Sequence, residues 1–254
     1  MTLAAISARL FGYAVTDHID TELAGFPYSG EDPEGSFEDA VLQREKHPEL
    51  IILAGVEMGQ AILNPAYEKH ILKLCRWDIV MGSVHSVRMK GFTDFFSGID
   101  FTGFDDKFID SYLTQYFIDL EETAETTDYD SLSHLTVPLR YIVHKYKRNV
   151  IAERYFESIR RILKAVIKRG KSLELNTSGF TESERYFMPD EYIIDEYIKL
   201  GGKDFTIGSD AHIPENMTSG LIEGTELLLS KGIKTLNYYK DRKKITYDTE
   251  GVIK

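Results

Sequence analysis

The chain has 254 residues, of which 43% are hydrophobic and 28% charged, a composition that excludes general disorder and supports a sizeable core. Thirty basic and 41 acidic side chains give a formal net charge of −11, which repels polyphosphate backbones and makes nucleic acid a poor candidate partner. The single cysteine, Cys75, excludes an intrachain disulfide. Because we find neither a signal sequence nor an apolar run of about 18 residues, we expect a cytoplasmic protein that does not span a membrane.

No Pro-, Gly- or Ser-rich linker divides the sequence, so we predict one domain over residues 1–254. Short apolar runs alternate with longer segments of helical period, and this alternation is typical of a parallel α/β architecture. The predicted strands are Tyr13–Thr16, Leu50–Val56, Ile79–Val84, Ser131–Ser133, Leu173–Asn176, Phe205–Gly208 and Lys234–Tyr238.

Helical periodicity fills the segments around these strands. One helix is predicted from about Asp105 to Glu125, and another ends at Gly170. We interpret the aromatic residues of both helices as core packing. The charged run Lys240–Lys244 is predicted to be a solvated turn. The chain also opens with apolar residues at helical spacing, Leu3, Ile6, Leu10 and Phe11. No predicted strand precedes them.

Four of the seven histidines share one kind of position, at or just past the end of an apolar strand-like run, and two carboxylates share it with them. These six residues are His18, Glu57, His85, His134, Asp210 and His212. In parallel α/β barrels the carboxyl ends of the strands form the ligand-binding face, so the six side chains are expected to converge. Any one of these histidines is more simply explained as a hydrogen-bonded core or loop residue, but chance does not readily repeat the placement six times. We interpret His47, His70 and His144 as solvated or structural.

Histidine and carboxylate ligands without an available thiolate suit Zn, Mn or Fe, and a carboxylate among several histidines can bridge two ions. Asp210 and His212 are two positions apart, so they share a face if the strand conformation continues through Ala211. Two ions together activate a hydroxide for phosphoester hydrolysis. Arg140 follows Pro138 near a predicted helix N-terminus and is a candidate phosphate-binding residue. Its alternative is an ordinary surface arginine.

Six strings in this order resemble the motifs of the polymerase-and-histidinol-phosphatase (PHP) superfamily, and most closely those of the monofunctional histidinol-phosphatases. They are Thr16-Asp17-His18, Gly55-Val56-Glu57, Gly82-Ser83-Val84-His85, Ser133-His134-Leu135, Leu173-Glu174-Leu175-Asn176-Thr177 and Gly208-Ser209-Asp210-Ala211-His212. The resemblance extends over nearly the whole chain, from Thr2 to about Tyr247.

The resemblance implies a distorted (β/α)7 TIM-like barrel with up to three divalent metal ions on its carboxyl face. By position, Glu57 would bridge two ions, and His85 and His134 would complete the second site. Asp210 would bind the first ion, and His18 with His212 would hold the third. Asp210 and His212 would also be catalytic, and the substrate would be a small phosphate ester, L-histidinol phosphate, hydrolysed to L-histidinol and phosphate.

One departure from the superfamily matters, because its members begin with a His-x-His motif on the first strand and these 254 residues contain no His-x-His. We therefore expect a chain that lacks the first strand, either begun at an internal methionine or shortened, with fewer ions and little activity. An upstream strand carrying the His-x-His motif is expected to restore metal binding and activity. Two alternatives stay open: a catalytically impaired remnant that binds a metal or a partner, and a PHP-type phosphodiesterase.

Overall fold

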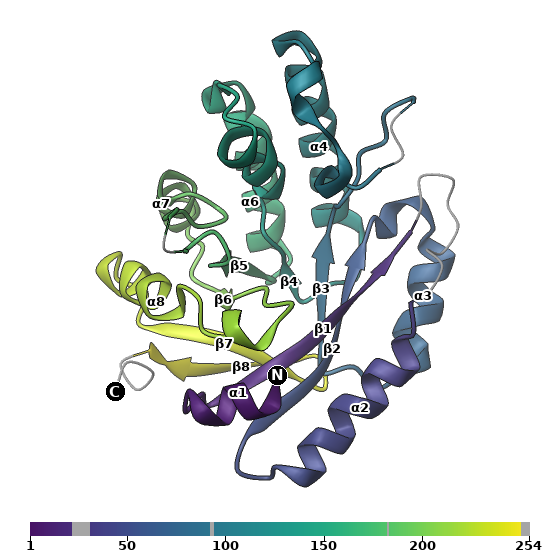
Figure 1. The fold of residues 1–254 in the computed structure, drawn as a ribbon, viewed down its shortest axis with the longest axis vertical. Coiled ribbons are helices and arrows are strands. Elements are labelled where there is room, and N and C mark those ends of the chain that lie inside the picture. The colour runs from purple at the N-terminus through teal and green to yellow at the C-terminus, as the bar shows by residue number, and fades with distance from the viewer. Residues whose placement is uncertain (22–30, 92–93, 182, 250–254) are drawn as a thin grey trace.

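In a computed structural model of the protein, residues 1–21, 31–91, 94–181 and 183–249 are described, and they form a curled parallel sheet with helices around it (Figure 1). The sheet has six strands whose spatial order follows the chain order. The predicted α/β, TIM-like architecture is confirmed. The strands are β1 (Gly12–Asp20), β2 (Ile51–Gly59), β3 (Ile79–Ser83), β4 (Ser131–Leu132), β5 (Ser172–Asn176) and β6 (Phe205–Gly208).

The central strands are continuous apolar runs because both of their faces are covered, and every residue of β3 and β5 is buried. The longest pairing joins β1 to β2, from Gly12 opposite Ile51 to Asp20 opposite Gly59. This register places the carboxyl ends of the two strands side by side. It therefore determines which side chains meet at that end of the sheet.

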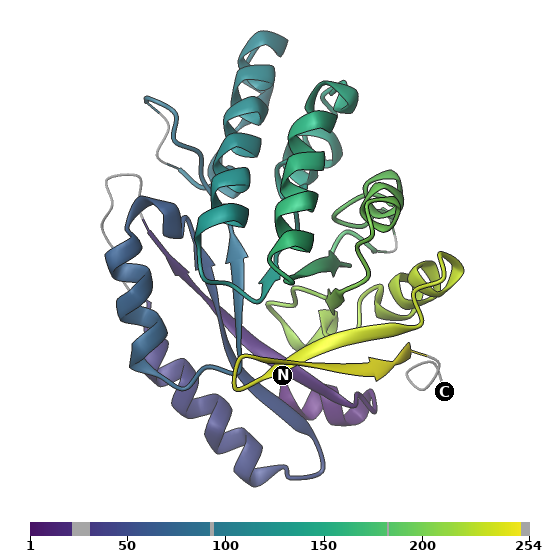
Figure 2. The ribbon, with the colours of Figure 1, turned by 180° about the vertical axis from the view of Figure 1, so that it is seen from behind.

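The helices lie in chain order around the sheet (Figures 1 and 2). Several begin at a polar cap: the side chains of Asp32, Asn64 and Asp105 each accept a hydrogen bond from a backbone N–H in the first turn. The α-helices are α1 (Thr2–Ser7), α2 (Pro33–Lys46), α3 (Pro65–Leu74), α4 (Asp106–Thr126), α5 (Val137–Leu139), α6 (Phe156–Lys168), α7 (Glu191–Lys199) and α8 (Leu221–Ser230).

Short helical turns connect these elements. The 3₁₀ turns are η1 (Ala61–Leu63), η2 (Phe96–Gly98), η3 (Phe101–Gly103), η5 (Ala152–Tyr155) and η6 (Pro214–Asn216), and η4 (Arg140–Lys145) is a π-helical turn. Among the described residues no helix has both the length and the apolar character needed to cross a bilayer.

The two long predicted helices are present as α4 and α6, and they pack on each other and on the sheet. Tyr112 and Tyr116 of α4 are fully buried, as are Ile159 and Leu163 of α6. Tyr116 also donates a hydrogen bond from its hydroxyl to the Leu135 carbonyl, at 3.0 Å. These stripes are therefore core packing, as their spacing predicts.

The seventh predicted strand does not join the parallel sheet. It forms β7 (Thr235–Lys240), which pairs antiparallel with β8 (Lys243–Asp248), a strand that the apolar pattern does not indicate. The hairpin lies at the amino ends of β3–β5 (Figure 2), where the Tyr239 hydroxyl donates to the Asp130 carbonyl at 3.0 Å. Its turn is not simply solvated, because Arg242 forms an ion pair with the buried Asp130 carboxylate at 2.5 Å.

Only part of the N-terminal apolar stripe packs against the rest of the protein. Helix α1 ends at Ser7, and its buried residue Ala5 packs with Leu50, Ile52 and Met217. Leu3 is 73% exposed, because so short a helix contacts the sheet along one narrow face. The stripe therefore predicts the helix only in part, because Leu10 and Phe11 lie beyond its end and Leu3 faces outward.

Candidate functional site

The candidate site lies at the carboxyl end of the sheet. His18 and Glu57 are register partners on β1 and β2, each two residues before the end of its strand. His85 follows the end of β3 by two residues, and His134 follows the end of β4 by two. Because these strands are parallel, the four side chains reach the same region of space.

A buried triad of Glu57, His85 and His134 forms the most compact part of the site. Oε1 of Glu57 lies 3.1 Å from Nε2 of His85 and 2.8 Å from Nε2 of His134, and the two nitrogens are 3.3 Å apart. A tetrahedral zinc ion with bonds of about 2.0–2.1 Å holds its ligand atoms roughly 3.3–3.4 Å apart. The spacing and the N, N, O donor set therefore fit a divalent metal ion.

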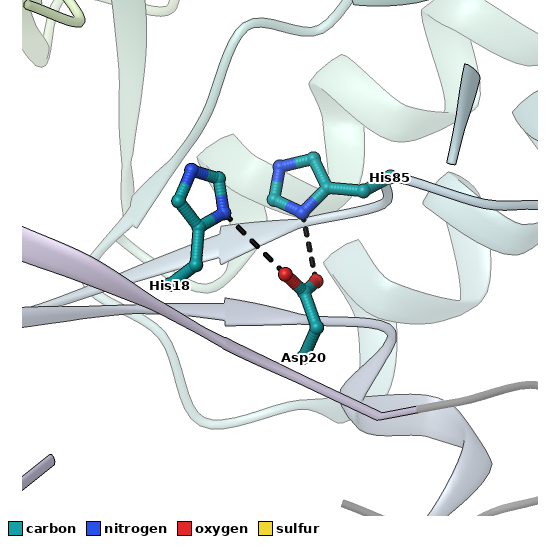
Figure 3. A group of neighbouring side chains, drawn as sticks. All are labelled: His18, Asp20 and His85. Atoms are coloured by element: carbon teal, nitrogen blue, oxygen red, sulfur yellow. Dashed lines mark hydrogen bonds and ion pairs between the residues drawn. The ribbon is translucent and has the colours of Figure 1, made fainter. Parts of the chain in front are cut away.

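Asp20, the last residue of β1, contacts His85 of this triad and also His18 (Figure 3). Its Oδ1 lies 2.8 Å from Nδ1 of His85, and its Oδ2 lies 3.4 Å from Nδ1 of His18. With Nδ1 of His85 held by a carboxylate, Nε2 faces the triad, which is the usual arrangement behind a metal-binding histidine. Among the described residues, donor atoms within 4.8 Å of one another form two groups: His18, Asp20 and His85, and Glu57, His85 and His134.

The triad is electrostatically coupled. Burial raises the pKa of Glu57, but the charges and hydrogen bonds of His134 and His85 outweigh it and hold the pKa well below its ordinary value. Burial opposes the charged form of His85 as well, yet Asp20 and Glu57 raise its pKa well above the ordinary value. A metal ion bound here competes with the proton on these nitrogens, so its affinity rises with pH.

Asp210 and His212 follow the end of β6 and belong to neither ligand group. The strand does not continue through Ala211: β6 ends at Gly208, and Asp210 adopts a left-handed backbone with φ +49°. The two side chains nevertheless meet, with His212 Nε2 3.4 Å from Asp210 Oδ1. The rings of His18 and His212 stack with centroids 5.9 Å apart, which places His212 beside the first ligand group.

Arg140 reaches into the same region from the start of the π-helical turn η4. Its Nη2 lies 3.3 Å from Asp210 Oδ2 and also donates to the Ser178 hydroxyl. It is three-quarters buried at the side chain, which is incompatible with an ordinary surface arginine. The remaining histidines lie outside both groups, and His144 stacks on Tyr186 with ring centroids 3.5 Å apart.

A family model described as "PHP domain" matches residues 1–178 of the chain. The chain belongs to the PHP family. A Lactococcus lactis protein named histidinol-phosphatase is 27% identical over 240 residues, which cover 94% of this chain and 87% of that protein. A Thermotoga maritima protein named "probable histidinol-phosphatase" is 29% identical over 175 residues, covering 66% of this chain and 71% of the relative.

The fold of this PHP domain also resembles a solved structure. A Lactococcus lactis histidinol phosphate phosphatase, crystallised with zinc, L-histidinol and phosphate, superposes with a TM-score of 0.73 at 20% sequence identity. The match covers 96% of this chain and 90% of that chain. It shows that the curled sheet and its helices have the PHP architecture.

The site of this PHP domain opens into a cavity of about 350 Å³, within the range of small-molecule pockets. Glu57 does not line the cavity itself but contacts His85 and His134, which do. The other six predicted site residues all line the cavity: His18, His85, His134, Arg140, Asp210 and His212.

Glu174 is a buried carboxyl that the strand pattern does not single out as part of the site. Its Oε2 accepts a hydrogen bond of 2.7 Å from the backbone N–H of His134, a residue with φ +21°. Burial and the neighbouring charge of Asp210 raise the pKa of Glu174 to about 8. In the sequence, Glu174 could have been found as a glutamate inside the apolar run Leu173–Asn176. Asp20 could have been found from its spacing to His18, since residues two apart on a strand share a face.

Proposed function

We propose that this chain is a metal-dependent phosphomonoesterase of histidine biosynthesis that hydrolyses L-histidinol phosphate to L-histidinol and phosphate. The observation that carries the proposal is the convergence of a buried N, N, O donor triad and a three-quarters-buried arginine on one cavity of the PHP fold. The relatives named histidinol-phosphatase, and the similar structure that contains zinc, L-histidinol and phosphate, support the choice of substrate.

Glu57, His85 and His134 would hold a Zn, Mn or Fe ion, which supplies positive charge for the phosphate oxygens and a hydroxide at neutral pH. His18, Asp210 and His212 would serve up to two further sites. Since Asp210 and His212 lie outside both compact ligand groups, we expect these further sites to bind more weakly.

The remaining roles follow from the charges around the cavity. Arg140 would bind two phosphate oxygens with its guanidinium group, which the Asp210 carboxylate positions at 3.3 Å. Asp210 would accept a hydrogen bond from the attacking water. His212, whose pKa the hydrogen bond to Asp210 raises, would donate a hydrogen bond to the ester oxygen of the leaving alcohol.

We also propose that residues 1–254 form a single metallophosphatase domain, because every strand of the parallel sheet contributes to one continuous core. Its substrate would be a small phosphate ester rather than nucleic acid. The net charge of −11 supports that choice, since a phosphodiesterase for nucleic acid needs a basic groove. Cytoplasmic location stays a prediction from the sequence.

The test is release of inorganic phosphate from L-histidinol phosphate by the purified chain, stripped with a chelator and then reloaded with Zn, Mn or Fe. We expect metal-dependent hydrolysis, slower than the roughly 1–10³ per second typical of enzymes, because the two three-donor groups found among the described residues share His85, and neither includes Asp210 or His212. A single-stranded oligonucleotide is the comparison substrate. Faster cleavage of the oligonucleotide would establish a phosphodiesterase, and metal binding without any turnover would establish the non-catalytic remnant.

A further inference from the structure

Glu31 is a cavity-lining carboxylate that neither the metal ligands nor Arg140 account for. It lies two residues before α2, and its Oε1 accepts a hydrogen bond of 2.7 Å from the backbone N–H of Asp20. Its Oε2 is buried and makes no hydrogen bond within the described part of the chain. Burial raises the pKa of Glu31 to about 7. It belongs to neither group of candidate metal ligands.

Aromatic side chains form another part of the cavity lining. Phe95, Phe96 and Tyr141 all line it, and Phe96 packs against Tyr141 with ring centroids 6.1 Å apart. The rings of Phe95 and Phe96 also lie edge-on to His85, at 6.2 and 6.4 Å between centroids. The cavity therefore combines a cationic and metal-binding region with an aromatic wall and a separate carboxylate.

We propose that Glu31 and this aromatic wall form the subsite for the alcohol half of the substrate, and that the Glu31 carboxylate binds a cationic nitrogen of that alcohol. The inference rests on the proposed function, which supplies a phosphate monoester whose alcohol carries an amine and an imidazole. Arg140 and the metal ligands would bind the negatively charged phosphate. Glu31 is the carboxylate that would bind the positively charged nitrogen of the alcohol.

The physical argument concerns the cost of the unpartnered oxygen. A buried carboxylate oxygen without a hydrogen-bond donor is unfavourable, and the Asp20 N–H satisfies only the other oxygen. An ammonium or imidazolium group would supply the missing donor. Aromatic faces attract the same cations and stack on an imidazole ring, so both parts of the subsite favour one kind of ligand.

The test compares the holoenzyme with Glu31→Gln, which keeps an acceptor for the Asp20 N–H but removes the charge. The first measurement is the ratio of kcat/KM for L-histidinol phosphate to kcat/KM for n-propyl phosphate, which has no cationic nitrogen. The second is the affinity for L-histidinol itself, by calorimetry. We expect both to fall about tenfold or more, the usual effect of a charge-assisted hydrogen bond. Glu31→Asp keeps the charge and is expected to lose less.

Glu38→Gln is the matched control, because Glu38 is an exposed glutamate of α2 outside the cavity and its replacement removes the same charge. If Glu31→Gln retains the preference for histidinol phosphate and the affinity for L-histidinol, the subsite is wrong while the proposed function stands. If the unmutated chain hydrolyses no phosphate ester but binds L-histidinol in a Glu31-dependent way, the proposed function is wrong while the subsite stands. An equal loss on both esters without a change in histidinol affinity would also overturn the subsite.

Discussion

Oδ1 of Asp20 lies 2.8 Å from Nδ1 of His85, although 65 positions separate the two residues in the chain. The contact joins the end of β1 to the loop after β3, across the end of β2. It restricts His85 to the ring orientation in which Nε2 faces Glu57 and His134. Much of the metal affinity of the site should therefore depend on a residue that does not itself belong to the Glu57 triad.

Asp20→Asn is expected to weaken binding of a divalent ion by about 10–100-fold, because the carboxylate that orients His85 and increases its basicity is lost. The measurement is a zinc titration against a chelating dye. Asp17→Asn is the matched control, since Asp17 lies on the same strand but is exposed and accepts a hydrogen bond from Ser36. Equal zinc affinity in the two variants would rule out the orienting role.

Glu57→Gln and His85→Ala are each expected to remove most of the bound metal and most of the phosphatase activity, because glutamine replaces the anionic carboxylate of the triad with a neutral amide and alanine removes the imidazole. The fold is expected to survive, which circular dichroism checks. Metal content by mass spectrometry provides the decisive measurement, with the exposed His70 changed to alanine as control. A stoichiometry equal to that of the unmutated chain would contradict the assignment.

Gly59→Ala is expected to damage the site through packing alone. A Cβ at Gly59 would lie 1.6 Å from Oδ1 of Asp20 and 2.9 Å from Nδ1 of His85, so one of them must move. We expect a loss of about 1–3 kcal/mol in the free energy of unfolding, measured in urea, together with weaker zinc binding. In contrast, Gly103→Ala meets no atom within 4 Å and should leave zinc binding unchanged.

Arg140→Ala is expected to raise KM for the phosphate ester by about 10–100-fold, which corresponds to about 1.5–3 kcal/mol for a charge-assisted hydrogen bond. Metal content should not change, because Arg140 is a donor and not a ligand. Arg140→Lys keeps the charge but loses the two-pronged geometry, so an intermediate KM is expected. An unaltered KM for L-histidinol phosphate would remove Arg140 from the substrate site.

Asp190→Asn is expected to stabilise the protein at neutral pH. Burial raises the pKa of the Asp190 carboxyl from 3.8 to about 6. Between those values the folded chain retains a proton that the unfolded chain releases, so this group lowers stability as pH rises and its effect levels off above pH 6. We expect a gain of about 1–3 kcal/mol at pH 7.5 that disappears below pH 4, from urea unfolding at each pH. Glu215→Gln, at an exposed position, is the matched control for the loss of one negative charge.

The sequence predicted the sheet well because buried parallel strands are apolar runs, and it predicted where the six ligand candidates lie because strand ends converge. It missed Asp20 because His18 and Asp20 interrupt the apolar pattern, so β1 was expected to end at Thr16 and instead continues to Asp20. His18 and Asp20, which interrupt the apolar pattern near the carboxyl end of β1, are residues that line the site.

The pairing of β7 could not be predicted for a different reason. Two-residue hairpin turns are usually recognised by glycine or asparagine, which readily adopt positive φ. This turn instead has Asp241 and Arg242 at φ +51° and +61°. Contacts far apart in sequence hold that conformation, including the Arg242 ion pair with Asp130. Such long-range contacts cannot be predicted from local residue preferences.

That hairpin also bears on how the chain folds during synthesis. Asp78 accepts a hydrogen bond from the backbone N–H of Asp241, 163 positions later in the chain. Asp130 accepts one from the side chain of Arg242, 112 positions later. Until the ribosome has released the last strands, the amino ends of β3 and β4 hold carboxylates that lack these partners. Long-range contacts of this kind slow folding and expose incomplete sheets to aggregation. The hairpin therefore packs onto the amino ends of the parallel sheet late, after all six candidate metal-binding residues have been translated.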